Sequence, residues 1–212
     1  MMKVLGIDIE LFHHASVKLK NGKIIYIDPF ELTGGSGLEK ADIVLITHSH
    51  YDHCSPNDVE MISDENTIII TVADAMSKLN HLKVKGIVLI EPGKTIKINS
   101  ETITAVPAYN INKQFHPKNN DWVGFIVQMK GVRVYHSGDT DLIPEMKDID
   151  VDIALLPVGG TYTMNAKEAA LATKTFKRCK IAIPMHYGTI VGSGSDAETF
   201  RENAGCEVKL LM

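Results

Sequence analysis

The side chains best suited to chemistry in this chain are crowded into one short segment. Three histidines and one aspartate lie within six residues, as His48, His50, Asp52 and His53. Imidazole and carboxylate groups are the ligands expected for zinc, manganese or iron. His48 and His50 point the same way in an extended chain, whereas Asp52 and His53 need a turn to face a second position. One ion cannot readily use all four groups, so the spacing predicts two adjacent metal ions.

Further candidate ligands occur at two distant places, each just after a short apolar run. Asp139 lies in the segment His-Ser-Gly-Asp-Thr, and His186 lies in the segment Met-His-Tyr-Gly-Thr. Loops at strand ends are where sheet proteins place functional side chains. A plain, solvated histidine-rich turn would need no such partners, so the pattern favours a metal site.

These residues resemble the motifs of a known family. The segment T-H-S-H-Y-D-H resembles the H-x-H-x-D-H motif of the metallo-β-lactamase superfamily, and residues 41–53, 136–140, 155–160 and 184–189 resemble that superfamily's successive motifs. His14-Ala15-Ser16, followed by Asp28-Pro29, resembles the branch that contains ascorbate-6-phosphate lactonase and the N-acyl-phosphatidylethanolamine phospholipase D enzymes. The first motif is highly specific for the superfamily and much less specific for a substrate.

The resemblance implies an α/β fold, namely a four-layer αβ/βα sandwich with two mixed sheets flanked by helices. It implies metal ions at the edge between the sheets, with zinc favoured and manganese or iron as alternatives. It also implies six ligands: His48 and His50 on a first ion, Asp52, His53 and His186 on a second, and Asp139 bridging both.

A seventh ligand departs from the family pattern. The superfamily usually has a histidine after the strand that corresponds to residues 102–106, where this chain reads Pro107-Ala108-Tyr109-Asn110. The nearest imidazole is His116, and we predict that a longer loop brings it to the first metal ion. The alternative is that His116 is a surface residue before Pro117 and that Asn110 or a water molecule completes the site.

The other histidines have separate predicted roles. His14 either supports the site or contacts substrate, or it is structural, and the sequence does not separate these roles. His136 is expected to be a buried, hydrogen-bonded core residue, whereas His13 and His81 are expected at the surface. Asp28 is expected to fix a turn or to make a supporting hydrogen bond.

Three cysteines, an odd number without a C-x-x-C pair, argue against a disulfide framework or a cysteine-rich zinc site. Cys54, Cys179 and Cys206 are therefore predicted to be packing residues.

Apolar patterning predicts the elements that position these groups. The predicted strands cover residues 1–10, read as one first strand, then 17–20, 23–27, 43–46, 67–72, 86–90, 94–98, 102–106, 122–129, 132–135, 153–156 and 181–183. Asn21-Gly22 predicts a hairpin turn. The predicted helices cover 56–63, 74–79, 165–177 and 196–204, with Asn165 and Asp196 as N-caps and Pro56 in a first helical position. Because no linker divides the chain, residues 1–212 are predicted to be a single domain.

Composition excludes several classes of function. The 212 residues carry a formal charge of −4, which disfavours a nucleic-acid partner. No apolar stretch approaches the ~20 residues of a membrane span, and the first ten residues do not read as a secretion signal, so a cytoplasmic location is predicted. A small-molecule substrate is expected, and a homo-oligomer is left open.

The predicted function is a metal-dependent hydrolase that attacks a small ester, lactone or phosphodiester with a metal-bound hydroxide. Asp52 is the predicted catalytic residue, which orients the hydroxide and then moves a proton. The lactonase-like activity ranks first because of the branch resemblance. A metal-dependent nuclease and a catalytically idle, metal-binding regulatory protein are the alternatives. Gly159 to Tyr162 form either a substrate loop or a simple turn.

Overall fold

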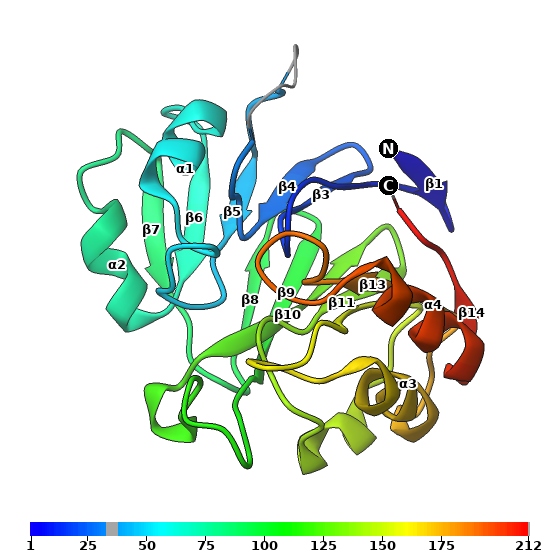
Figure 1. Cartoon of the computed structure of the whole chain (residues 1–212). Helices are drawn as coiled ribbons and strands as arrows, with labels where there is room; N and C mark the ends of the chain where they lie inside the picture. The colour runs from blue at the N-terminus through cyan, green and yellow to red at the C-terminus, as the bar shows by residue number, and fades with distance from the viewer. Residues whose placement is uncertain (33–37, 212) are drawn as a thin grey trace. The chain divides into compact units, whose positions relative to one another are not determined.

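Two seven-stranded sheets, one in each half of the chain, organise the structure. The computed structural model describes residues 1–32 and 38–211, which divide into the units Met1–Glu91 and Pro92–Met212. Each unit contains one mixed sheet and two α-helices (Figure 1). The predicted α/β class, with two mixed sheets flanked by helices, is confirmed. That the whole chain acts as a single domain stays a prediction.

The first unit carries a sheet whose strands follow chain order. They are β1 (Met2–Val4), β2 (Ile7–Leu11), β3 (Val17–Lys20), β4 (Ile24–Ile27), β5 (Ile43–Leu45), β6 (Ile68–Thr71) and β7 (Gly86–Leu89). β1 to β4 pair antiparallel, whereas β4 to β7 pair parallel. Helix α1 (Pro56–Ile62) connects β5 to β6, and helix α2 (Ala73–Leu79) connects β6 to β7, as is usual between parallel strands.

The second unit carries a sheet in the order β14-β13-β12-β11-β10-β9-β8. Its strands are β8 (Thr95–Ile98), β9 (Glu101–Pro107), β10 (Val123–Met129), β11 (Val132–His136), β12 (Ile153–Pro157), β13 (Ile181–Met185) and β14 (Glu207–Val208). β8 to β11 pair antiparallel and β11 to β14 pair parallel. The helices are α3 (Ala166–Thr175) and α4 (Gly194–Asn203), which pack on each other, and two short 3₁₀ turns, η1 (Lys118–Asn120) and η2 (Pro144–Asp148).

Local signals in the sequence explain most element ends. Gly22 has a φ of +81° in the hairpin turn between β3 and β4, which pair as predicted. Pro56 opens α1, and Asn165 caps α3 by accepting hydrogen bonds from the amides of Lys167 and Glu168.

The prediction that Asp196 is an N-cap was wrong. α4 begins earlier, and the Asp196 carboxylate accepts from the Ser193 amide at 2.7 Å as the third helical residue of a capping box.

Two features of the strands were not predicted. The prediction of one strand in residues 1–10 was wrong, because Leu5 and Gly6 turn the chain with positive φ angles and separate β1 from β2. β14 has only two residues, too few for an apolar period to show. In the described residues, no helix is long and apolar enough to cross a bilayer.

Candidate metal centre

In the first unit, the histidine-rich segment forms a tight turn just after β5. The amides of His53 and Cys54 both donate to the carbonyl of His50, at 3.1 and 2.8 Å. This is the predicted turn, which lets the residues after His50 face a different direction from His48.

Asp28, which follows β4, holds this segment in place. Its Oδ1 accepts from the Thr47 amide at 2.8 Å, and its Oδ2 accepts from the Thr47 hydroxyl at 2.6 Å. The same Oδ2 lies 2.7 Å from Nδ1 of His53, and all three side chains are buried. The predicted supporting role of Asp28 is confirmed. A carboxylate on the far nitrogen is the usual way in which proteins orient a metal-binding histidine.

The hydrogen bonds of Asp28 and Thr47 also fix which ring nitrogens can bind a metal. A carboxylate only accepts, so Nδ1 of His53 is the donor and its lone pair is on Nε2. The Thr47 hydroxyl gives its proton to Asp28, so Nδ1 of His48, 2.9 Å from that hydroxyl, must also be a donor. Nε2 is therefore the atom that each of the two rings presents to a metal ion.

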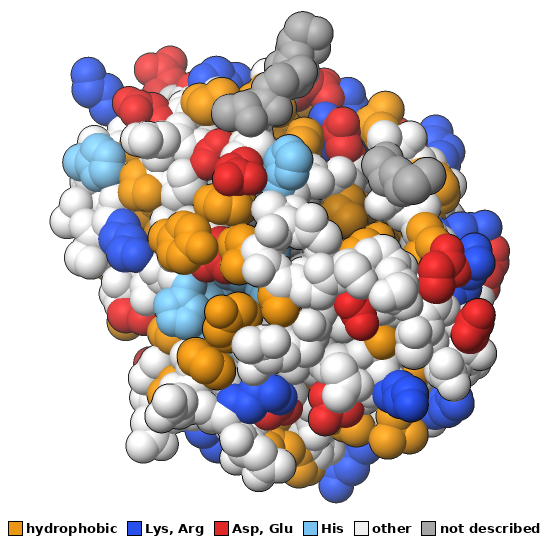
Figure 2. Space-filling model, viewed as in Figure 1, with side chains coloured by type: hydrophobic (Ala, Val, Ile, Leu, Met, Phe, Trp, Pro, Cys, Tyr) orange, Lys and Arg blue, Asp and Glu red, His pale blue; other side chains and the backbone are white. Residues whose placement is uncertain are grey.

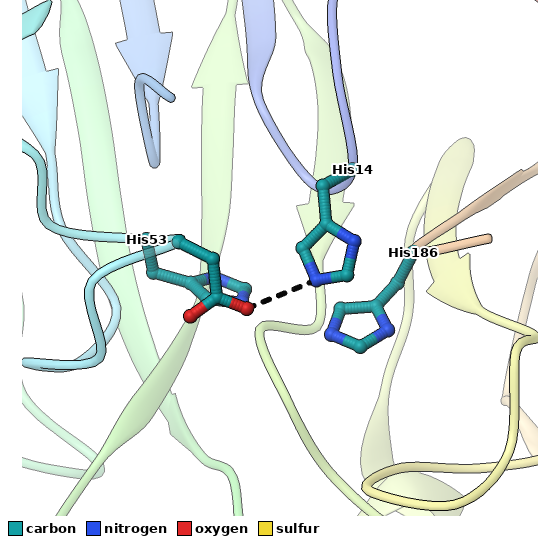
Figure 3. A group of neighbouring side chains, drawn as sticks. His14, His53 and His186 are labelled. Atoms are coloured by element: carbon teal, nitrogen blue, oxygen red, sulfur yellow. Dashed lines mark ion pairs between the residues drawn. The ribbon is translucent and has the colours of Figure 1, made fainter. Parts of the chain in front are cut away.

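His14, whose role the sequence left open, meets the predicted catalytic residue. It follows β2, is 3% exposed, and places Nε2 3.1 Å from Oδ2 of Asp52 (Figure 3). Ligand atoms of His14, Asp52 and His53 lie within 4.8 Å of one another. His14 is thus a further candidate ligand or partner of Asp52, and the tripeptide His14-Ala15-Ser16 was the only signal for it in the sequence.

In the second unit, Asp139 lies between two histidines. Its Oδ2 is 3.2 Å from Nε2 of His116 and 3.1 Å from Nε2 of His186, whose ring is drawn in Figure 3. Ligand atoms that lie ~2.1 Å from a tetrahedral ion are ~3.4 Å apart. The spacing in this group is close to that value, and all three residues are at most 4% exposed.

His116 is 1% exposed, so the alternative that it is a surface residue was wrong. Its amide donates to Oδ1 of Asn110 at 3.0 Å, and the Asn110 amide donates to its carbonyl at 2.7 Å. Nδ1 of His116 lies 3.2 Å from Oδ1 of Asn110 and 3.2 Å from the carbonyl of Tyr162. Both neighbours are acceptors, so Nδ1 is the donor and the lone pair is on Nε2. The side-chain oxygen of Asn110 therefore orients the His116 ring by accepting hydrogen bonds from the His116 amide and from Nδ1.

Asp141 fastens the loop that carries His116. Its carboxylate accepts from the Ile111 amide at 2.8 Å and from Nδ2 of Asn110 at 3.2 Å, and it pairs with the ammonium group of Lys113. These bonds hold the loop between Asn110 and His116 in one conformation. His116, six residues after Asn110, is thereby placed beside Asp139 with a fixed ring orientation.

The backbone conformation of three residues supports a functional role for the candidate ligands in both units. His14, Asp28 and His186 all have positive φ angles, of +59°, +47° and +59°. Residues other than glycine avoid this region, and each such conformation costs ~1–3 kcal/mol unless surrounding contacts enforce it. Such strain is concentrated at functional sites in proteins.

The predictions for His13, His81, His136 and Cys54 agree with the structure. His136 is fully buried and its Nδ1 accepts from the Gly138 amide at 3.2 Å, whereas His13 and His81 are exposed. Cys54 is 1% exposed, and burial raises the pKa of its thiol to about 12, so it is a packing residue. Cys179 and Cys206 are only partly buried and lie side by side, which packing alone did not predict.

The donor set fits divalent transition metals. Imidazole nitrogen and carboxylate oxygen, without a cysteine thiolate among them, suit zinc, manganese and iron. The lone pair of His116 Nε2 faces a carboxylate oxygen at 3.2 Å, and two acceptors approach so closely only with a cation between them or a second proton on the ring.

Comparison with known proteins identifies relatives of this chain. Residues 8–186 match the family model described as the β-lactamase superfamily domain. A UPF0173 metal-dependent hydrolase of Thermococcus onnurineus is 31% identical, over 97% of this chain and 96% of the relative. A protein of the same description from Archaeoglobus fulgidus is 36% identical, over 94% of this chain and 92% of the relative.

Solved structures agree. A protein of Parabacteroides distasonis, provisionally named a metal-dependent hydrolase, is 36% identical with a TM-score of 0.83, over 97% of this chain and 94% of that one. The metallo hydrolase Igni18 of Ignicoccus hospitalis is 25% identical with a TM-score of 0.76, over the same shares of the two chains.

Proposed function

Since the chain belongs to the β-lactamase superfamily and is a metal-dependent hydrolase, we propose that it uses two divalent ions to hydrolyse a small ester, lactone or phosphodiester. One observation carries this proposal. In His48, His53 and His116, Nδ1 is occupied by a protein acceptor or hydroxyl, so Nε2 is the atom presented for a ligand. A partner on the far ring nitrogen is how proteins usually orient a metal-binding histidine.

The proposed ligands follow the family pattern. His48, His50 and His116 hold the first ion, Asp52, His53 and His186 hold the second, and Asp139 bridges both. The position of Asp139 beside both His116 and His186 supports the bridging role. We also propose that the two units work as one hydrolase domain, because the matched family model runs through residues 8–186 and so crosses their boundary.

When bound, the two ions would lower the pKa of a shared water molecule and polarise the carbonyl or phosphoryl oxygen of the substrate. The chain contributes the orientation of the reacting groups. Asp52 has its Oδ2 held at 3.1 Å by His14, which fixes the carboxylate where it can orient the nucleophile and then carry a proton to the leaving group. Zinc is the proposed ion, with manganese and iron as alternatives.

A small substrate is favoured over a nucleic acid. On the face shown in Figure 2, Lys and Arg side chains are interspersed with Asp and Glu, so that face lacks the single-sign field that attracts a phosphate backbone. The branch resemblance places lactones first among the proposed substrates, and this ranking stays a prediction.

The test is a substrate panel with the metal-loaded protein. Lactones, carboxylic esters, phosphodiesters and single-stranded DNA would be assayed with zinc, manganese or iron, and again after chelation. We expect turnover of one small-molecule class that chelation abolishes. Asp52→Asn should lower kcat by ~10²–10⁴, whereas Asp121→Asn should not, because Asp121 is exposed in a left-handed turn that asparagine tolerates. Tight metal binding without any hydrolysis would contradict the proposal and favour the idle regulatory protein.

A further inference from the structure

Cys179 and Cys206 form a pair in the second unit, away from the candidate ligands in the sequence. Their Sγ atoms are 3.5 Å apart although the residues are 27 positions apart in the chain. Cys179 lies just before β13, and Cys206 lies between the end of α4 and β14. Both side chains are partly buried, so neither is shielded from a small reagent as Cys54 is.

The backbone around the pair suits a disulfide bond. β13 and β14 are parallel neighbours, with Ile181 opposite Glu207, so Cys206 lies one residue before β14 and Cys179 lies two residues before β13. Strands ~4.8 Å apart with an offset of one residue, ~3.3 Å, place Cα atoms ~5.8 Å apart, within the ~4.4–6.8 Å that separates the Cα atoms of bonded cysteines. The sulfur atoms need to approach by ~1.5 Å to reach the length of an S–S bond, which side-chain rotation provides.

We propose that Cys179 and Cys206 are a redox-active dithiol that a low-molecular-weight disulfide oxidises to an intramolecular disulfide bond. The thiolate of Cys206 attacks one sulfur of the oxidant, forming a mixed disulfide and releasing one small thiol. The Cys179 sulfur then attacks Cys206, forming the protein disulfide, and releases the second small thiol. The two cysteines lose two electrons and two protons, and the oxidant gains them as two thiols.

The contacts of the pair indicate which sulfur reacts first. The Cys179 thiol donates a hydrogen bond to the Ile181 carbonyl at 3.5 Å, and in the contact between the two sulfur atoms either one can be the donor. This contact lowers the pKa of Cys206. The same contact, together with burial, raises the pKa of Cys179. Because the thiolate is the attacking species, Cys206 is the nucleophile and Cys179 the resolving residue.

The bond would fasten the edge of the second sheet. β14 has two residues, and nearby backbone bonds from Glu207 to Lys180 and from Lys209 to Ala182 hold it to β13. A disulfide that closes a loop of this length stabilises a protein mainly by restricting the unfolded chain. The Cys179–Cys206 bond would lie before the first residue of β13, whereas His186 follows the last residue of that strand. We therefore expect the candidate ligands to keep their positions when the bond forms.

The experiment uses the full-length, metal-loaded protein and glutathione disulfide. We expect the native protein to become about 2 Da lighter than its reduced form, to lose two of its three thiols and to stay monomer-sized on a non-reducing gel. Peptide mapping should place the bond between Cys179 and Cys206. Tm should rise by about 5–10 °C, and both the hydrolytic activity and the metal content should stay unchanged.

Two variants and one denatured control complete the test. Cys179→Ser should stop at the mixed disulfide with glutathione on Cys206, and Cys206→Ser should react far more slowly. The proposal is wrong if the native protein keeps three thiols while the urea-unfolded chain is oxidised. It is equally wrong if oxidation links two chains, or if Cys179→Ser still becomes about 2 Da lighter.

Discussion

Asp28 and Asn110 have the same task in the two units, since each orients the imidazole of a candidate metal ligand. Asp28 binds Nδ1 of His53 through a carboxylate, and Asn110 accepts from the amide of His116 and lies beside its Nδ1. Residues of this kind do not contact the metal, yet they decide which ring nitrogen is presented to it. Substitutions should therefore separate ligands from the residues that orient them.

The first prediction compares two buried aspartates. Asp139→Asn should lower the affinity for metal more than Asp28→Asn, because the proposed bridging carboxylate touches both ions. The loss for Asp28→Asn should be ~10–100-fold, as for other residues that orient a ligand. Competition with a chromophoric chelator measures both affinities, and circular dichroism checks the fold. Equal losses in the two variants would contradict the distinction.

The second prediction concerns the departure from the family pattern at His116. His116→Ala should empty the first metal position and leave the second occupied, since His116 is the proposed third ligand of the first ion. Asn110→Ala should weaken the same position by ~10–100-fold, because the imidazole loses its orienting partner. Anomalous scattering from crystals of both variants gives the occupancy of each position. Full occupancy of the first position in His116→Ala would show that His116 is not a ligand.

The loops at the strand ends carry the candidate ligands, and close backbone packing fixes those loops. Gly159 follows β12, and a Cβ atom there would lie 2.4 Å from the carbonyl oxygen of His186. The loop that begins at Gly159 therefore supports the residue after β13 through a contact that only glycine permits.

The third prediction follows from this contact. Gly159→Ala should displace His186 and selectively weaken the second metal position, with a loss of stability of ~1–3 kcal/mol from overpacking. Gly194→Ala is the control, because a Cβ atom at the start of α4 meets nothing within 4 Å. Urea unfolding and metal titration of both variants are the measurements. A Gly159→Ala protein that behaves like Gly194→Ala would refute the supporting role.

The fourth prediction concerns Asp152, which joins neighbouring strands of the second sheet. Burial alone would raise its pKa, but the Arg133 amide at 3.0 Å and the Lys180 ammonium at 2.9 Å outweigh that effect and lower it. Its stabilising contribution is therefore present above the unfolded-state pKa of ~3.9 and is lost as the pH falls through the lower folded-state value.

Asp152→Asn should consequently lower the free energy of unfolding by ~1–2 kcal/mol at pH 7. The difference between the two proteins should shrink as the pH falls from ~4 through the lower folded-state pKa of Asp152, because the unfolded chain takes up a proton there before the native carboxylate does. Urea unfolding of both proteins across this range measures it. A difference that is constant with pH would show that the charge of Asp152 does not matter.

The whole protein should depend on its metal ions for stability as well as for activity. The fifth prediction is that gently purified protein carries close to two transition-metal ions per chain. Ions that bind only the folded chain add RT ln(1 + [M]/Kd), or ~4 kcal/mol at a thousandfold excess over Kd. Elemental analysis gives the metal content, and chelation should lower Tm by several degrees. A Tm that does not respond to chelation or to added zinc would contradict it.

The sequence by itself determined most of the strands and the main group of candidate ligands. Apolar runs such as 43–46, 132–135 and 181–183 ended where polar residues began, and they became β5, β11 and β13. The turn at Asn21-Gly22 and the cap at Asn165 were also predictable. All these features depend on residues within a few positions of one another, so their physical causes are visible in a short stretch of sequence.

Only the tertiary structure decided how distant residues meet. It placed His116 beside Asp139, gave Asn110 an orienting role, and joined His14 to Asp52. It also brought the sulfur atoms of Cys179 and Cys206 together across 27 positions. Strand order and register set these contacts, together with left-handed backbone at residues such as His14. Neither follows from a local pattern, because each is fixed by packing among segments that are far apart in the chain.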